Sequence, residues 1–280
     1  MRNCGVLVAL VLLSLATPLA RADIAATSTS QTVSASGVTE FFPLPIECEI
    51  YNLSCYPPPG GLLPGGQQYN NTASNSTLPP VNLSESGSAQ ALPPYLDGRN
   101  ISAQSSASQT VNVTPNQISL DLETVDQASG FSELANWQAA GSSEFSVTFD
   151  LTGAAVVDLS GTASGEVGGA PGQQISFLQI TFLLSSPGGF QSGETFPLTG
   201  ASPFETSFDD PVFLNPGSYT LTADVTGSLT LGDFTGFDVV GGGLTLNADF
   251  TDVPEPRWSF VVPLALLVVL WRPLRARSRS

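Results

Sequence analysis

Carboxyl groups are the chemically active residues that this sequence holds in quantity. The chain of 280 residues contains 24 Asp and Glu, 8 Arg, and neither Lys nor His. Asp121, Glu123 and Asp126 lie close together, and Asp209 and Asp210 are adjacent. Two carboxyl groups across a cleft could act as the acid and base of a glycosidase, and several in loops could bind calcium.

The placement of these acids argues against both chemistries. Asp121 and Glu123 fall on the outward face of a predicted strand, where acids usually provide solubility and protect sheet edges. Asp209 and Asp210 are expected in a loop, but no Asp, Asn and Gly residues are spaced around them as in a calcium-binding loop. We therefore expect no catalytic residue, no metal site and no cofactor.

The composition excludes several other kinds of chemistry. Without histidine the chain lacks Ser-His-Asp catalysis, Cys-His catalysis and imidazole ligands for zinc. Between Asp23 and Glu255, where all 24 acids lie, Arg99 is the only base. A body this acidic repels phosphate backbones, so nucleic acid is not an expected partner.

Two cysteines, Cys48 and Cys55, follow the N-terminal apolar segment. An even pair in an exported protein favours a disulfide that closes a small loop. The alternative is a redox or metal-binding pair. Two thiolates without histidine leave a metal site incomplete unless Glu47 or Glu49 joins them.

The elements that must position these residues are strands. Over 101–252 the chain shows the period of two that is typical of half-buried antiparallel strands, with apolar and polar residues alternating over 145–151, 219–231 and 244–250. Residues 175–184 are apolar on both faces, which suits a central strand. The prediction is an all-β fold, an antiparallel β-sandwich or jelly roll.

Two kinds of interruption are expected within this domain. Gly227, Gly232 and the glycine run 241–243 predict turns or bulges between short strands. Residues 132–139 are the one segment that suits a helical turn, and we expect it on an edge of the sandwich.

The region 23–100 is rich in Ser, Thr, Asn, Pro and Gly. It holds too little apolar surface to offset chain entropy, so 57–98 is predicted to be an extended, flexible surface segment. The tetrapeptide Ser-Gln-Thr-Val occurs at 30–33 and again at 108–111. This repeat is either a coincidence in a Ser/Thr-rich chain or a sign that 27–36 adds a strand to the sandwich.

Residues 1–22 have the three parts of a secretory signal peptide. Arg2 provides a positive start, 6–16 form an apolar run, and a small-x-small site ends at Ala22. A retained anchor is a weaker interpretation because the apolar run is short for a bilayer. We expect cleavage before Asp23 and export of the chain.

The segment 253–280 also has three parts. They are a motif of Val253, Pro254, Glu255 and Pro256, an apolar run from Trp258 to Trp271, and a basic tail with Arg272, Arg275, Arg277 and Arg279. Fourteen helical residues span about 21 Å, less than a hydrocarbon core of about 30 Å, and Pro263 weakens the helix further. The arginines are retained in the cytoplasm, so the chain before them is exported.

This order of motif, apolar helix and arginine cluster resembles the PEP-CTERM sorting signal of Gram-negative bacteria. The resemblance covers 253–280. It implies a precursor held transiently in the inner membrane and read by an exosortase-like membrane transpeptidase, which removes the helix. It also implies a mature protein at the cell surface or in the extracellular matrix, linked to exopolysaccharide or biofilm. The alternative is a single-pass tail anchor.

The expected function is therefore that of an exported, non-enzymatic protein of structural or interaction type. One alternative is a secreted carbohydrate-binding module, which would need exposed aromatic side chains on a concave face. Trp137 is the only tryptophan between the two terminal segments. Another is an extracellular hydrolase, which would need two carboxyl groups converging in a cleft.

We predict that Cys48 and Cys55 are oxidised in the exported protein. Closing so short a loop should contribute at most about 2–3 kcal/mol. Thiol alkylation before and after reduction measures the redox state. Labelling of both cysteines in native secreted protein without reductant would contradict the disulfide.

Overall fold

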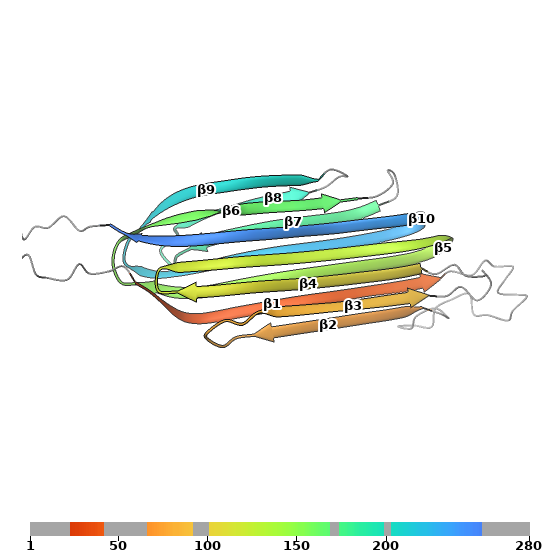
Figure 1. Cartoon of the computed structure of the whole chain (residues 1–280), viewed down its shortest axis with the longest axis horizontal. Helices are drawn as coiled ribbons and strands as arrows, with labels where there is room; N and C mark the ends of the chain where they lie inside the picture. Colours follow the sequence, from red (N-terminus) through yellow and green to blue (C-terminus); the bar gives the residue numbers. More distant parts are fainter. Residues whose placement is uncertain (1–22, 42–65, 92–100, 169–173, 199–202, 254–280) are drawn as a thin grey trace, which may run out of the picture.

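The computed structural model describes residues 23–41, 66–91, 101–168, 174–198 and 203–253, and this part of the chain is all-β without a helix. Figure 1 shows strands running along the length of the molecule. They are β1 (Ile24–Phe41), β2 (Gln67–Asn75), β3 (Leu83–Ala91), β4 (Ile101–Thr114), β5 (Gln117–Leu151), β6 (Ala155–Val167), β7 (Gln174–Ser185), β8 (Gln191–Leu198), β9 (Phe204–Leu214) and β10 (Gly217–Asp252).

The two longest strands, β5 and β10, each fold back on themselves (Figure 1). A Cβ added at Gly141 would lie 3.2 Å from Oδ1 of Asp126, although both residues belong to β5. A straight strand would separate them by about 50 Å. A Cβ at Gly227 would likewise lie 3.5 Å from Cγ1 of Val240 within β10.

The halves of these strands form the centres of two antiparallel sheets that pack as a β-sandwich. Sheet I has the order β3–β4–β5–β10–β6–β9 and uses the first half of β5 and the second half of β10. Sheet II has the order β2–β1–β5–β10–β7–β8 and uses the other two halves. Because β5 and β10 stay paired through the fold-back, the sheets are joined by continuous backbone.

The core lies between the two sheets, and its inward residues alternate along every central strand. Phe149 is fully buried and stacks on Tyr219 at 6.0 Å between ring centroids. It also meets Phe250 edge-on at 5.2 Å. The largest fully buried side chains are Trp137, Phe149, Ile101, Ile118, Leu122, Leu159, Leu178, Ile180, Leu184, Leu214, Leu221 and Leu229.

The predicted strands lie in these sheets. Residues 145–151 belong to β5, and 219–231 and 244–250 to β10. The apolar members of 145–151, 219–229 and 244–250 face inward. Residues 175–184 belong to β7, which pairs with β10 on one side and β8 on the other. The prediction of a central strand there is confirmed.

Two predictions about interruptions are wrong. Residues 132–139 form no helical turn, because their backbone pairs with β10 within β5. Gly227 and 241–243 are not turns, because they lie inside β10 and pair with β5. The bulge expected near Gly232 is present, since the register shifts between Gly232 and Phe234.

The expectation of a flexible segment over 57–98 is wrong for the residues that the structure describes there. Strand β2 pairs with β1, and β3 pairs with β4. These strands are polar and mostly exposed, so backbone hydrogen bonds to a neighbouring strand, rather than apolar burial, account for their order. The segment 27–36 lies within β1, between β2 and β5.

A buried glutamine fixes the loop between β2 and β3. The Oε1 of Gln31 accepts hydrogen bonds from Nδ2 of Asn75 at 2.6 Å and from the backbone N–H of Val81 at 3.1 Å. Its Nε2 donates to the carbonyl of Val81 at 2.8 Å. Gln31 is 1% exposed, and these partners satisfy both ends of its amide.

The first and last described strands begin and end at the same end of the sandwich, at the left in Figure 1. The N–H of Ile24 donates to the carbonyl of Pro115, and the N–H of Phe250 donates to that of Asn116. The N–H of Val253 donates to the carbonyl of Ala154. Within the described ranges, no helix is long and apolar enough to cross a membrane.

We predict that Phe149→Ala lowers the free energy of unfolding by about 3–5 kcal/mol, because it leaves a cavity beside two aromatic rings. The exposed neighbour Asp150 provides the control, and Asp150→Ala should change stability by less than about 0.5 kcal/mol. Urea denaturation followed by circular dichroism measures both. Equal losses in the two variants would contradict the core described here.

Candidate functional site

A groove crosses the outer face of sheet I, where β10 lacks side chains. Gly241 and Gly243 face outward, and a Cβ at either would meet no atom closer than 3.6 Å. Gly242 faces inward, where a Cβ would lie 2.5 Å from Cδ1 of Leu178. The bare backbone forms the floor of an open groove of about 620 Å³. The glycines that resembled turns in the sequence therefore shape a surface.

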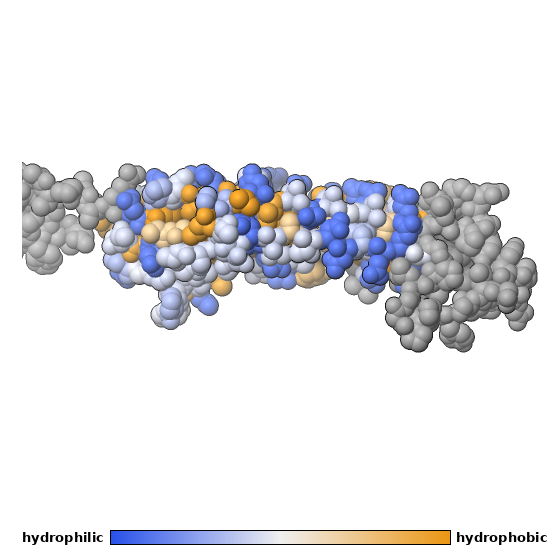
Figure 2. Space-filling model, turned by 90° about the horizontal axis from the view of Figure 1, so that it is seen from below, coloured by the Kyte–Doolittle hydropathy of each residue, from blue (hydrophilic) through white to orange (hydrophobic). Residues whose placement is uncertain are grey.

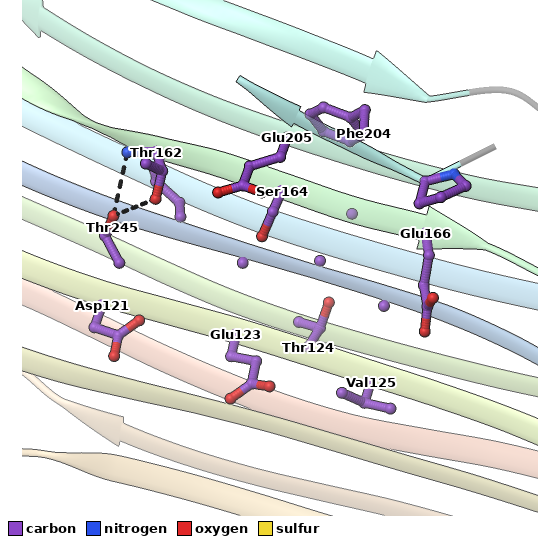
Figure 3. A pocket seen from close by; sticks show the side chains of 16 residues that line it. Asp121, Glu123, Thr124, Val125, Thr162, Ser164, Glu166, Phe204, Glu205 and Thr245 are labelled. Atoms are coloured by element: carbon purple, nitrogen blue, oxygen red, sulfur yellow. Dashed lines mark hydrogen bonds between the residues drawn. The ribbon is translucent and has the colours of Figure 1, made fainter. Parts of the chain in front are cut away.

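Acidic side chains stand on both sides of this floor (Figure 3). Asp121 and Glu123 come from β5, Glu166 from β6 and Glu205 from β9, and all four are exposed. The strand register brings them together, because Gly243 pairs with Glu123 on one side and with Ser164 on the other. Ser164 in turn pairs with Glu205.

Hydroxyl groups line one end of the groove. The side chains of Thr162 and Thr245 share a hydrogen bond of 2.7 Å, and the N–H of Thr162 donates to Oγ1 of Thr245 at 3.2 Å (Figure 3). Phe204 lines the opposite wall and packs against the core. The groove thus offers carboxylate and hydroxyl oxygens beside one aromatic ring.

The charge of the groove is uncompensated, because the described residues include no Lys, Arg or His. Such a surface can accept hydrogen bonds and attract cationic or hydroxyl-bearing ligands. Among the described residues, no three Asp, Glu, Cys or His side chains lie close enough to hold a metal ion.

A second set of acids lies further along the same face. Asp158 on β6 is paired directly with Asp249 on β10, and Asp209 on β9 is its near neighbour. The adjacent carboxyl of Asp209, which can share a proton with Asp158, raises the pKa of Asp158, and loss of hydration and the charges of Asp209 and Asp249 add to this. Like charges directly opposite one another in a sheet are destabilising.

Asp209 and Asp210 do not lie in a loop, as the sequence predicted, but within β9. Their strand pairs with β6, which supplies the backbone hydrogen bonds that a loop would lack. Oδ2 of Asp210 accepts a hydrogen bond from the hydroxyl of Ser192 on β8 at 3.0 Å. The two acids sit on an edge strand, where charge opposes pairing with another chain.

The outer face of sheet II carries a smaller groove of about 420 Å³ lined mainly by Ser and Thr. Glu144 and Asp224 are paired directly across β5 and β10 within it. Loss of hydration raises the pKa of Asp224, the charge of Glu144 adds to this, and the hydroxyl of Thr226, 2.9 Å from both carboxylate oxygens, opposes it. Hydroxyl pairs continue the face, such as Ser34 with Ser142 at 2.8 Å.

The structure separates the acids that the sequence placed together. Asp121 and Glu123 are exposed on the outer face, as predicted, whereas Asp126 is buried between the sheets. Glu166 and Glu205 were missed, because only the register of β6 and β9 brings them to the same groove. The sequence offered one signal for Glu166, which is the alternation of apolar and polar residues along β6.

The terminal candidates lie almost wholly outside the described residues. Val253 is the last described residue. Outside the described ranges lie Cys48, Cys55, Pro254, Glu255, Pro256, the run from Trp258 to Trp271, Arg272, Arg275, Arg277 and Arg279.

Comparisons with known proteins do not identify a family for this chain. No protein-family model matches the chain, and no curated protein matches it significantly. Among solved structures it is similar to VP2 of infectious bursal disease virus in derived T=1 particles, at 14% identity and a TM-score of 0.21, covering 84% of this chain and 65% of that one. A VP2 subviral particle of the same virus gives 12% identity, a TM-score of 0.20, and coverage of 84% and 67%. The chain thus spans less than two thirds of the first of these proteins, and TM-scores this low carry no argument.

We predict that Asp158→Asn stabilises the protein at pH 7 by about 0.2–1 kcal/mol, the usual range for a cross-strand pair. Because the pKa of Asp158 is raised in the folded state, the folded state binds the proton of this carboxyl more tightly than the unfolded state does. Stability is therefore lost as pH rises above 3.8, the ordinary pKa of an Asp carboxyl, and through the raised pKa of Asp158 in the folded state.

Thermal unfolding between pH 4 and pH 8 measures this effect, and the Asn variant should show a flatter profile than the parent. Asp121→Asn is the matched control, because Asp121 pairs with Thr245 and Thr110 rather than with an acid. An equal gain in the control would show that general charge reduction, rather than the Asp158 contact, is responsible.

Proposed function

We propose that this protein is exported, sorted at its C-terminus by an exosortase-like membrane transpeptidase, and acts at the cell surface or in the extracellular matrix as a non-enzymatic structural or interaction protein. The observation that carries the proposal is the position of the sorting motif directly after the last strand of the sandwich. Exopolysaccharide or a biofilm matrix is the proposed setting.

The N-terminal side supports the proposal through the start of β1. The first strand begins at Ile24, one residue after the expected cleavage site. The carbonyl of Asp23 accepts a hydrogen bond from the hydroxyl of Thr152 at 3.3 Å. Removal of residues 1–22 would leave every described strand intact.

The C-terminal side supports it in the same way. Strand β10 ends at Asp252, and the N–H of Val253 donates to the carbonyl of Ala154. Val253 lies at the same end of the sandwich as Asp23, and residues 254–256 follow it directly in the sequence. A transpeptidase that cuts at the motif would release the folded body without removing a strand.

The surfaces of the body favour an interaction role over the carbohydrate-binding alternative. Trp137 is fully buried, so it cannot stack on a sugar ring. The large exposed aromatics of the described residues are Phe213 and Phe237, at 55% and 57% exposure. Ser, Thr and acidic side chains dominate both outer faces, as on the grooves described above.

One observation favours the hydrolase as a second candidate. Carboxyl groups stand on both sides of the sheet I groove, and Glu166 and Glu205 face Asp121 and Glu123 across it (Figure 3). Release of reducing sugars from polysaccharides, lost in Glu166→Gln or Glu205→Gln, would favour this candidate. Absence of hydrolysis over a broad panel favours the structural role.

We predict that protein from its native host begins at Asp23 and ends close to Glu255, because the terminal segment is too short for a lasting anchor. Processing removes residues 1–22 and about the last 24 of the 280 residues. Intact-mass measurement of the mature protein tests both cuts. A mass that includes Ser280 contradicts the sorting step and favours a tail anchor.

Glu255→Ala should block the C-terminal cut and leave the protein in the inner membrane fraction. Glu166→Ala, which removes an exposed acid from the folded body, is the matched control and should be processed normally. Normal processing of Glu255→Ala would show that the motif is not what the enzyme recognises.

A further inference from the structure

A carboxyl group is buried at the centre of the sandwich. Asp126 on β5 is 0% exposed. Its Oδ1 accepts a hydrogen bond from the hydroxyl of Ser105 at 2.6 Å, while its Oδ2 has no hydrogen-bond partner. An unpaired buried acid is costly unless it is protonated or reached by water.

Central strands enclose this carboxyl on most sides. Ser105 belongs to β4, and Thr124 and Gly141 belong to β5. Gly227 on β10 lies close enough that a Cβ there would be 2.6 Å from Oδ2 of Asp126. Each of these strands is paired on both sides, so none can move away without breaking a sheet.

The remaining neighbour, Tyr69, comes from the edge strand β2. Its ring fills the space over two glycines on opposite sheets, Gly37 on β1 and Gly87 on β3. A Cβ at Gly37 would lie 2.6 Å from the ring, and a Cβ at Gly87 would overlap it. The hydroxyl of Tyr69 is buried, and Gly87 beneath its ring pairs directly with Ser105, whose hydroxyl donates to Asp126. Tyr69 therefore closes the side of the sandwich next to Asp126.

No positive charge lies near this carboxyl among the described residues. Loss of hydration raises the pKa of Asp126 to about 7, and hydrogen bonds from Ser105 and Gly141 offset this only in part. Burial and the charge of Asp126 raise the pKa of Tyr69. Among the other acids on β1, β3, β4, β5 and β10 whose burial is described, Asp238 on β10 is the one that is buried. Glu40, Glu85 and Asp224 are half-buried, and the exposed ones are Asp121, Glu123, Glu144, Asp150, Asp249 and Asp252.

We propose that Asp126 and Tyr69 form a proton-dependent latch on strand β2. With Asp126 protonated, Tyr69 stays inserted and the sandwich is closed on the β2 side. When Asp126 is ionised, water must reach the carboxylate. Tyr69 then leaves its position between the sheets, and β2 separates from β1.

Of the strands around Asp126, β2 is the one expected to separate from the sandwich with the smallest loss of free energy. It pairs with one strand only, and most of its side chains are polar and exposed. Of its side chains, Tyr69 alone reaches between Gly37 and Gly87. Local openings of this kind draw on the parts of a fold with the fewest buried apolar contacts.

The direction of the pH dependence follows from proton linkage. In the open state Asp126 is hydrated and its pKa is near the ordinary value of 3.8 for an Asp carboxyl, whereas in the closed state its pKa is about 7. The closed state holds the proton more tightly, so the latch is fully closed at low pH. Closure weakens by up to about tenfold per pH unit as pH rises between these values, and then levels off.

Hydrogen exchange of the whole protein tests the latch, with rates corrected for intrinsic exchange at each pH. We expect amide protection over 67–75 to fall at least about tenfold between pH 5 and pH 8. Protection in the central strand β6 should stay higher than that over 67–75 at both pH values, because β2 opens locally while β6 exchanges only through larger openings. In Asp126→Asn the protection of β2 should lose its pH dependence. Asp238→Asn is the matched control for a buried acid on a neighbouring strand and should keep it.

A second variant keeps the test valid if Asp126→Asn does not fold. Tyr69→Ala opens a path for water to Asp126, so β2 should be poorly protected and insensitive to pH. The proposal is overturned if β2 protection depends on pH as in the parent protein when either Asp126 or Tyr69 is replaced. It is also overturned if the parent protein shows no local change over 67–75.

Discussion

The antiparallel pairing of β5 with β10 is the interaction on which the rest of the structure depends. The two strands stay in register from Gly217 opposite Leu151 to Asp249 opposite Gln117, with one bulge, while the ribbon they form folds back on itself. Each sheet is built outward from one half of this ribbon, and the fold-back sets the sheets face to face. A break in the pairing would therefore remove the centre of both sheets at once.

The interior of the sandwich differs along this ribbon. Towards the end where β1 starts and β10 finishes, it is packed with large apolar side chains such as Phe149, Leu221 and Phe250. Towards the fold-back, glycines and buried polar groups such as Ser105 and Asp126 lie among apolar side chains such as Trp137 and Ile101. The large apolar side chains supply most of the burial free energy, and Asp126 is a buried acid set among them.

The outer faces of the described residues carry acids, rows of hydroxyl groups and two grooves. Figure 2 shows the molecule from another side, where apolar residues gather towards the left and most of the remaining surface is polar. Several acids face other acids across neighbouring strands, as Asp158 faces Asp249 and Glu144 faces Asp224. Such contacts lower stability as pH rises.

The sequence by itself determined the all-β class, the inward faces of the apolar half and the outward position of Asp121 and Glu123, because alternation with period two is a local property of each strand. It failed over 132–139, Gly227 and 241–243, where small and polar residues interrupt the alternation in the sequence. Only the tertiary structure decided that these segments continue β5 and β10, that polar β2 and β3 join the sheets, and that Glu166 and Glu205 share a groove with Glu123. Pairing between strands far apart in the chain supplies the hydrogen bonds and the register in each case, and no local pattern encodes it.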